Sequence, residues 1–86
     1  MTYGPFQPDL DPAERVARLR AMQALCLGFA RQHPEVGRTL AAAESDPGRL
    51  PVAQELIAKL PAKNRRRLLA TYADLVRGRW DAARGR

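Results

Sequence analysis

The side chains best able to do chemistry in this 86-residue sequence are the five consecutive ones from Lys63 to Arg67. Four are cationic, and the fifth, Asn64, carries an amide. Arginine donates paired hydrogen bonds to phosphate oxygens, and an asparagine amide can pair with the adenine edge in the DNA major groove. The pattern predicts a nucleic-acid interface in which cations hold the phosphate backbone and Asn64 reads a base. Its expected residues, with two arginines further along as additional backbone contacts, are Lys63, Asn64, Arg65, Arg66, Arg67, Arg77 and Arg79.

The positive charge is concentrated in the last third of the chain. Residues 1–58 contain six Lys and Arg against seven Asp and Glu, whereas residues 59–86 contain nine against two, which gives the net charge of +6. Such segregation favours attraction to a polyanion. The competing interpretation is a solvated helix face in an arginine-rich protein, because the chain has thirteen arginines and only two lysines.

The basic run also stands at the expected start of a helix, just after Pro61. The positive end of the helix dipole disfavours cations there by a few tenths to about 1 kcal/mol, while the exposed N–H groups favour anions. In a helix-turn-helix motif, the same part of the second helix enters the major groove. The segments 51–60 and 62–80 match that motif in length and connection, although a proline replaces the usual glycine of the turn.

No arrangement of side chains predicts an enzyme. The one histidine, His33, and the one cysteine, Cys26, are seven positions apart and lack a third catalytic partner. Cys26 lies in a nonpolar run and is expected to be a buried structural thiol. The six glycines are scattered and form no phosphate-binding loop. We therefore expect no catalytic residues, no cofactor and no metal.

The composition favours helices, because fifteen alanines and eleven leucines stand against one isoleucine and four valines. The first helix is marked by a capping carboxylate at Asp11, before a proline in the first helical position. Prolines and a polar loop at 44–48 separate the later helices. The sequence predicts an all-α bundle of about four helices, at 12–32, 35–43, 51–60 and 62–80. A single domain at 11–80 would be flanked by an extended N-terminal arm, 1–10, and a frayed basic tail, 81–86.

The first predicted helix is nonpolar almost all round, since only Gln23 is polar between Ala21 and Ala30. Such a helix is buried on several sides, which three short partners in a chain of this size can barely achieve. It is either the central core helix of a monomer or a helix that also pairs with a second subunit. The expected dimer or partner interface combines a ridge of small residues with two aromatic anchors: Ala17, Ala21, Ala24, Gly28, Phe6 and Trp80.

The chain lacks the signals of a membrane or secreted protein. No apolar run approaches the roughly 20 residues that cross a bilayer. The first twelve residues contain Asp9, Asp11 and three prolines where a signal peptide would be apolar. With a single cysteine, the expectation is a cytoplasmic protein without a disulfide and without membrane association.

The sequence is compatible with two different functions. The leading hypothesis is a small, homodimeric DNA-binding protein of regulatory or accessory type, attached electrostatically through its last helix. RNA is a further polyanion that the basic run would suit. The alternative is a protein-interaction module, an adaptor or an antagonist of a larger regulator, that uses the apolar faces of the first helix. Phosphate binding weakens steeply with added salt, whereas an apolar contact hardly responds, so salt dependence separates the two.

Overall fold

The computed structural model of the chain describes the backbone of residues 3–84 and the side chains of residues 3–78. Within this part of the chain all regular structure is helical, which confirms the predicted all-α bundle. Four α-helices and two short 3-10 helices follow one another. They are η1 (Gly4–Phe6), α1 (Pro12–Phe29), α2 (Pro34–Ala42), η2 (Pro47–Arg49), α3 (Leu50–Ala58) and α4 (Ala62–Arg84).

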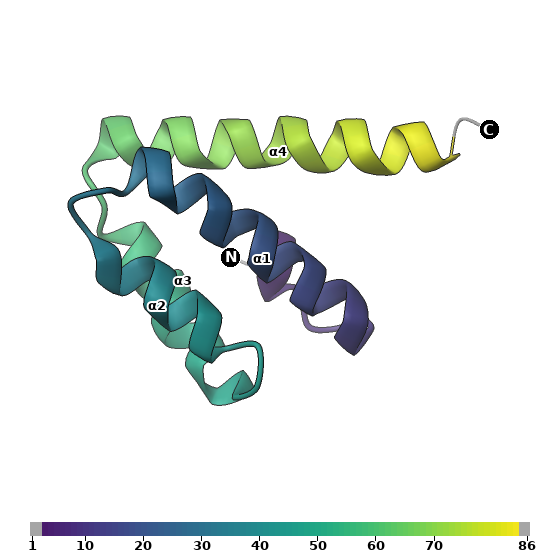
Figure 1. Cartoon of the computed structure of the whole chain (residues 1–86), viewed down its shortest axis with the longest axis horizontal. Helices are drawn as coiled ribbons and strands as arrows, with labels where there is room; N and C mark the ends of the chain where they lie inside the picture. The colour runs from purple at the N-terminus through teal and green to yellow at the C-terminus, as the bar shows by residue number, and fades with distance from the viewer. Residues whose placement is uncertain (1–2, 85–86) are drawn as a thin grey trace.

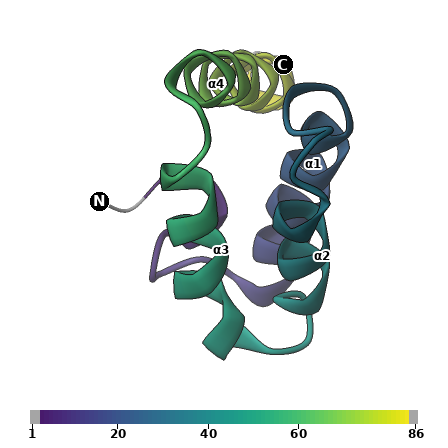
Figure 2. The same cartoon turned by 90° about the vertical axis from the view of Figure 1, so that its left-hand side faces the viewer.

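The helices form a small body with one long helix across its end. Helix α1 packs against α2, and α2 packs against α3. Figure 1 shows α4 lying across these helices, with its C-terminal half extending beyond them. Figure 2 shows α3 facing α1 and α2 across the body, below α4. The main packing partner of α4 is α1 rather than α3, so the helix-turn-helix detail predicted from the sequence is not confirmed.

Helix α1 ends at Phe29 rather than at the predicted residue 32. Ala30 leaves the helical conformation with a φ of −134°. In the turn that follows, the His33 N–H donates to the Ala30 carbonyl over 3.0 Å. Pro34 disfavours a helical conformation at the residue before it, so the chain must leave α1 several residues earlier.

The later helices depart from their predicted bounds by one to four residues. Helix α3 stops at Ala58, and the Leu60 N–H closes a turn on the Ile57 carbonyl before Pro61 interrupts the chain. Helix α4 begins at Ala62 as predicted but continues to Arg84. Residues 81–84 of the predicted frayed tail are therefore helical, and the last two residues lie outside the described part of the chain.

The N-terminal segment is docked rather than extended. Arg15 of α1 donates hydrogen bonds from its guanidinium to the carbonyls of Pro5, Gln7 and Pro8, at 2.8 to 3.2 Å. Arg18, one turn later, donates to the Gly4 carbonyl over 3.3 Å. The two arginines thereby hold η1 against α1.

One hydrophobic core joins the four α-helices. Met22 of α1, Leu40 of α2, Ile57 of α3 and Leu68 of α4 have no exposed surface. Full burial of a side chain of this size stabilises the fold by about 1.5–3 kcal/mol. Phe6 of η1 joins the same core at 7% exposure, so the docked N-terminal segment completes it.

Candidate nucleic-acid interface

Asn64 points back into the protein rather than out to solvent. Its Nδ2 atom donates a partly buried hydrogen bond to the main-chain carbonyl of Phe29 over 3.0 Å. Phe29 is the last residue of α1, and the final carbonyls of a helix lack partners within the helix. Asn64 therefore closes the end of α1 from the first turn of α4. The amide donor predicted to read a base is engaged inside the protein.

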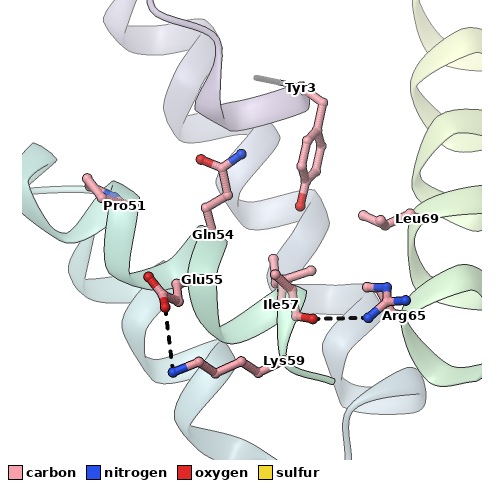
Figure 3. Close-up of a pocket in the computed structure, with 9 residues that line it drawn as sticks. Tyr3, Pro51, Gln54, Glu55, Ile57, Lys59, Arg65 and Leu69 are labelled. Carbon is pink, nitrogen blue, oxygen red and sulfur yellow. Dashed lines mark hydrogen bonds and ion pairs between the residues drawn. The ribbon is translucent and has the colours of Figure 1, made fainter. Parts of the chain in front are cut away.

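Arg65 holds the end of the other neighbouring helix. Its Nη1 atom donates to the Ala58 carbonyl over 3.0 Å, the contact drawn as a dashed line in Figure 3. The same atom donates to the Leu60 carbonyl over 3.4 Å. These carbonyls belong to the last residue of α3 and to the turn that follows it, so the guanidinium stabilises the break before Pro61. Two residues of the basic run thus fix the start of α4 to the ends of α1 and α3.

The other three cations of the run point outward. Lys63, Arg66 and Arg67 are exposed, and their i, i+3 and i+4 spacing places them on one face of α4. Across the described side chains, none of the three has a carboxylate within 4.0 Å. Many other cations do pair with an Asp or Glu: Arg18, Arg20, Arg49, Lys59 and Arg77. The outer face of the first α4 turns therefore carries uncompensated positive charge.

Two polar hollows lie where the start of α4 meets the end of α1. One, of about 330 Å³, is lined by Gly28, Phe29, Lys63, Asn64 and Arg67. The other, also of about 330 Å³, is lined by Gly28, Arg31, Gln32, His33, Pro61 and Asn64. Because the hollows share Gly28 and Asn64, Arg31 reaches the same corner of the molecule as Lys63 and Arg67. We call Arg31, Lys63, Arg66 and Arg67 the basic corner.

Arg31 is a member of the site that the basic run at 63–67 does not predict. Arg31 lies in the turn after α1, far along the chain from Lys63, and only the packing of α4 on α1 brings the two together. Its side chain is exposed and has no carboxylate within 4.0 Å in the described residues. The available sequence signal was that Arg31 has no acidic residue closer along the chain than Glu35. In the structure the Glu35 carboxylate lies 3.7 Å from the His33 imidazole rather than near Arg31.

The two further arginines predicted as backbone contacts stand apart from this corner. Arg77 lies more than two turns along α4, and its Nη2 atom is 2.9 Å from the Asp74 carboxylate. That exposed pair leaves no excess charge at its position. The side chain of Arg79 lies outside the described residues.

The expected dimer or partner interface is only partly available. Ala17 and Ala21 are half-buried, whereas Ala24 and Gly28 are exposed on α1. Phe6 is in the core, so its predicted role as a partner anchor does not fit the docked N-terminal segment. The Trp80 side chain lies outside the described residues. A residue that the sequence analysis missed, Leu27, is 78% exposed beside Ala24 and Gly28.

The residues with reactive side chains are placed for structure. Cys26 is buried at 5% exposure, as predicted, and burial raises the pKa of its thiol to about 11. At neutral pH the thiol is protonated and is a poor nucleophile. Nowhere in the described residues do three His, Cys, Asp or Glu side chains gather as metal ligands would.

Comparisons with protein-family models, curated proteins and solved structures find no match to this chain. Among residues 3–84, no helix combines the length and the apolarity needed to cross a membrane. The fold and the site define a small helical bundle with a cationic corner built from two helix ends.

Proposed function

We propose that the basic corner binds the phosphate backbone of DNA, in a protein of regulatory or accessory type. The observation that carries this proposal is the uneven pairing of charge. Arg31, Lys63 and Arg67 line two hollows that share Gly28 and Asn64, and Arg66 lies on the same exposed face of α4 as Lys63 and Arg67. These four cations have no carboxylate partner among the described residues, whereas many cations elsewhere are paired. Unpaired arginines and lysines at this density attract a polyanion and gain charge-assisted hydrogen bonds to phosphate oxygens.

The scaffold beneath the corner supports this assignment. Asn64 and Arg65 hold the first turn of α4 against α1 and α3, so the outward cations are carried on a fixed helix start. A rigid support reduces the conformational entropy lost when charged side chains are ordered on a ligand. Phosphate contacts of this kind position a protein on DNA without reading sequence, so non-specific binding is the expected baseline.

Fluorescence anisotropy with a mixed-sequence duplex tests the proposal. Each phosphate contact changes the slope of log Kobs against log salt by about −0.9, so three or four contacts give a slope of roughly −3. Replacement of Lys63, Arg66 or Arg67 by alanine should in each case make the slope less negative by about 1. Arg49→Ala is the matched control, because Arg49 is exposed but paired with Asp46 at 3.7 Å.

Two outcomes decide against the proposal. One is a duplex affinity that the triple variant Lys63→Ala, Arg66→Ala, Arg67→Ala leaves unchanged while its helical circular dichroism is retained. The other is a loss of affinity in the Arg49→Ala control as large as in the corner variants. Competition with single-stranded and duplex RNA in the same assay distinguishes DNA from RNA as the preferred polyanion.

A second candidate function, contact with a second copy or another protein, is favoured by one feature of α1. Ala24, Leu27 and Gly28 share one helix face by their i, i+3 and i+4 spacing, and Leu27 is 78% exposed. An added Cβ at Gly28 would meet no atom within 4 Å, so another helix could approach closely there. Light scattering behind a sizing column tests this: a mass of 9.6 kDa at all concentrations excludes a dimer, and Leu27→Gln should dissociate one.

A further inference from the structure

A third hollow, separate from the basic corner, lies between α3 and α4. Its volume is about 540 Å³, within the range of small-molecule sites, and its walls are mainly apolar. Figure 3 shows α3 on one side, α4 on the other and Tyr3 of the N-terminal segment between them. Ile57 of α3 and Leu69 of α4 supply apolar surface, and Ala58 lies exposed at its border.

Two cations, Lys59 and Arg65, and one carboxylate, Glu55, line this hollow. Lys59 is paired with Glu55 at 3.6 Å, so Arg65 is the cation that is available to a ligand. Its orientation is fixed, because Nη1 donates to the carbonyls of Ala58 and Leu60. A guanidinium has five N–H donors, and the Nε and Nη2 donors of Arg65 make no hydrogen bond to any residue that the structure describes. Nor does any described carboxylate lie within 4.0 Å of Arg65. A preorganised cation thus lines an apolar hollow with part of its donor capacity unused.

Tyr3 supplies a second polar group. Its ring packs against Phe6 in an edge-to-face arrangement with centroids 5.2 Å apart, and its hydroxyl points into the hollow (Figure 3). Burial raises the pKa of the Tyr3 phenol, so the hydroxyl stays protonated and can donate a hydrogen bond. The polar groups of the hollow therefore include two hydrogen-bond donors suited to an anionic oxygen.

Tyr3 and Leu69 are shared between this hollow and a second one. The second hollow has a volume of about 450 Å³. Tyr72, Ala73 and Val76 extend its apolar wall along α4. An elongated apolar group with its anionic end at Arg65 would fit this arrangement better than a compact, polar ligand.

We infer that the hollow between α3 and α4 binds a small aliphatic carboxylate, with its carboxylate on Arg65 and its chain lying along Leu69 towards Val76. Charge complementarity selects the anionic head, and the apolar walls select the chain. This site is distinct from the basic corner, since Arg65 points inward while Lys63, Arg66 and Arg67 point outward.

Isothermal titration with octanoate, and with 1-octanol as the neutral analogue, tests the inference on the full-length chain. We expect one octanoate per chain and binding of 1-octanol weaker by about tenfold to a hundredfold, because the neutral alcohol lacks the charge that pairs with the Arg65 guanidinium. Arg65→Gln should weaken octanoate binding by about the same factor. Arg66→Gln, the neighbouring outward arginine, should leave it unchanged.

A second variant keeps the test decisive if Arg65→Gln disturbs the fold. Ala58→Phe adds a bulky ring at a residue that lines the hollow but keeps the main-chain carbonyl that accepts from Arg65. It should abolish octanoate binding with an unchanged circular dichroism spectrum. Equal binding of octanoate and 1-octanol, retention of octanoate by Ala58→Phe, or its loss in Arg66→Gln would each overturn the inference. Duplex binding by Ala58→Phe should persist, which separates this site from the proposed DNA contact.

Discussion

The side chain of Asn64 and the main chain of Phe29 are joined by a hydrogen bond of 3.0 Å, which ties the first turn of α4 to the last residue of α1. This bond lies beneath the basic corner, whose cations come from α4 and from the turn that follows α1. The same contact therefore stabilises the fold and sets the distance between Arg31 and Lys63. Removing the hydrogen bond between Asn64 and Phe29 is the most direct test of that dual role.

We expect Asn64→Ala to lower the free energy of unfolding by about 1–3 kcal/mol, because the Phe29 carbonyl loses its donor in a partly buried position. Asn64→Asp keeps the shape but faces the carbonyl with a second acceptor, and should destabilise at least as much. Urea denaturation followed by circular dichroism measures both. An Asn64→Ala variant as stable as the parent would show that this bond contributes nothing to the fold.

Gly4 is a position where only glycine fits. Its φ is +49°, and a Cβ there would lie 2.6 Å from Cε2 of Tyr72. Gly4→Ala combines a strained backbone with a clash, so we expect a loss of about 1–3 kcal/mol in unfolding free energy and release of the N-terminal segment. Hydrogen exchange at residues 3–10 reports that release. Protection equal to that of the parent would contradict the expected undocking.

At Gly37 we predict the opposite effect of a glycine-to-alanine substitution on stability, so Gly37→Ala is a matched control for Gly4→Ala. Gly37 lies within α2, and an added Cβ would meet no atom within 4 Å. Gly37→Ala should therefore raise the free energy of unfolding by about 0.5–1 kcal/mol, because alanine loses less backbone entropy in a helix. The midpoint of urea denaturation measures this change in stability. A lower midpoint in Gly37→Ala would mean that α2 requires glycine for a reason other than space.

Tyr72 buries a hydroxyl without a hydrogen-bond partner in the described part of the chain. An unsatisfied buried donor costs about 1–3 kcal/mol, so Tyr72→Phe should leave stability unchanged or raise it. Leu68→Ala, one turn earlier in the same core, should instead lose about 2–5 kcal/mol. If thermal denaturation shows Tyr72→Phe clearly destabilised, the hydroxyl has a partner in solution.

Stability should decline at alkaline pH. Burial raises the pKa of Cys26 from 9.0 to about 11 and that of Tyr72 from 10.0 to about 12. The unfolded chain then releases these protons at lower pH than the folded protein, so the unfolding free energy falls as pH rises above about 9. Below that pH the contribution is complete and constant. Urea titrations from pH 8 upward check this, and Tyr72→Phe should flatten the part of the decline above about pH 10.

The starts of the helices could be predicted because they are specified locally. Asp11 accepts a hydrogen bond from the Ala13 N–H at 3.1 Å, which is the cap expected from its place before Pro12. The burial of Cys26 also followed from its nonpolar neighbours. The end of α1 was placed three residues too late, because the length of the turn before Pro34 depends on how α2 packs.

The roles within the basic run could not be predicted from the run itself. Residue type suggested that Asn64 and Arg65 would contact a ligand, yet both bind carbonyls at the ends of other helices. Which carbonyls are within reach depends on the crossing of α4 over α1, a tertiary property that local sequence does not encode. The aromatic residues Tyr3 and Phe6 did suggest a docked segment, over the bundle or across a dimer. The contacts that hold Phe6 within its own chain come from Arg15 and Arg18 and depend on tertiary packing.

The contact between Gly4 and Tyr72 joins the fourth residue of the chain to the seventy-second. During synthesis the segment around Gly4 leaves the ribosome well before the tyrosine that it covers. Loop closure over such a span is slow compared with the formation of neighbouring helices. We therefore expect this segment to reach its place only after α4 has folded onto α1, although it is synthesised earlier.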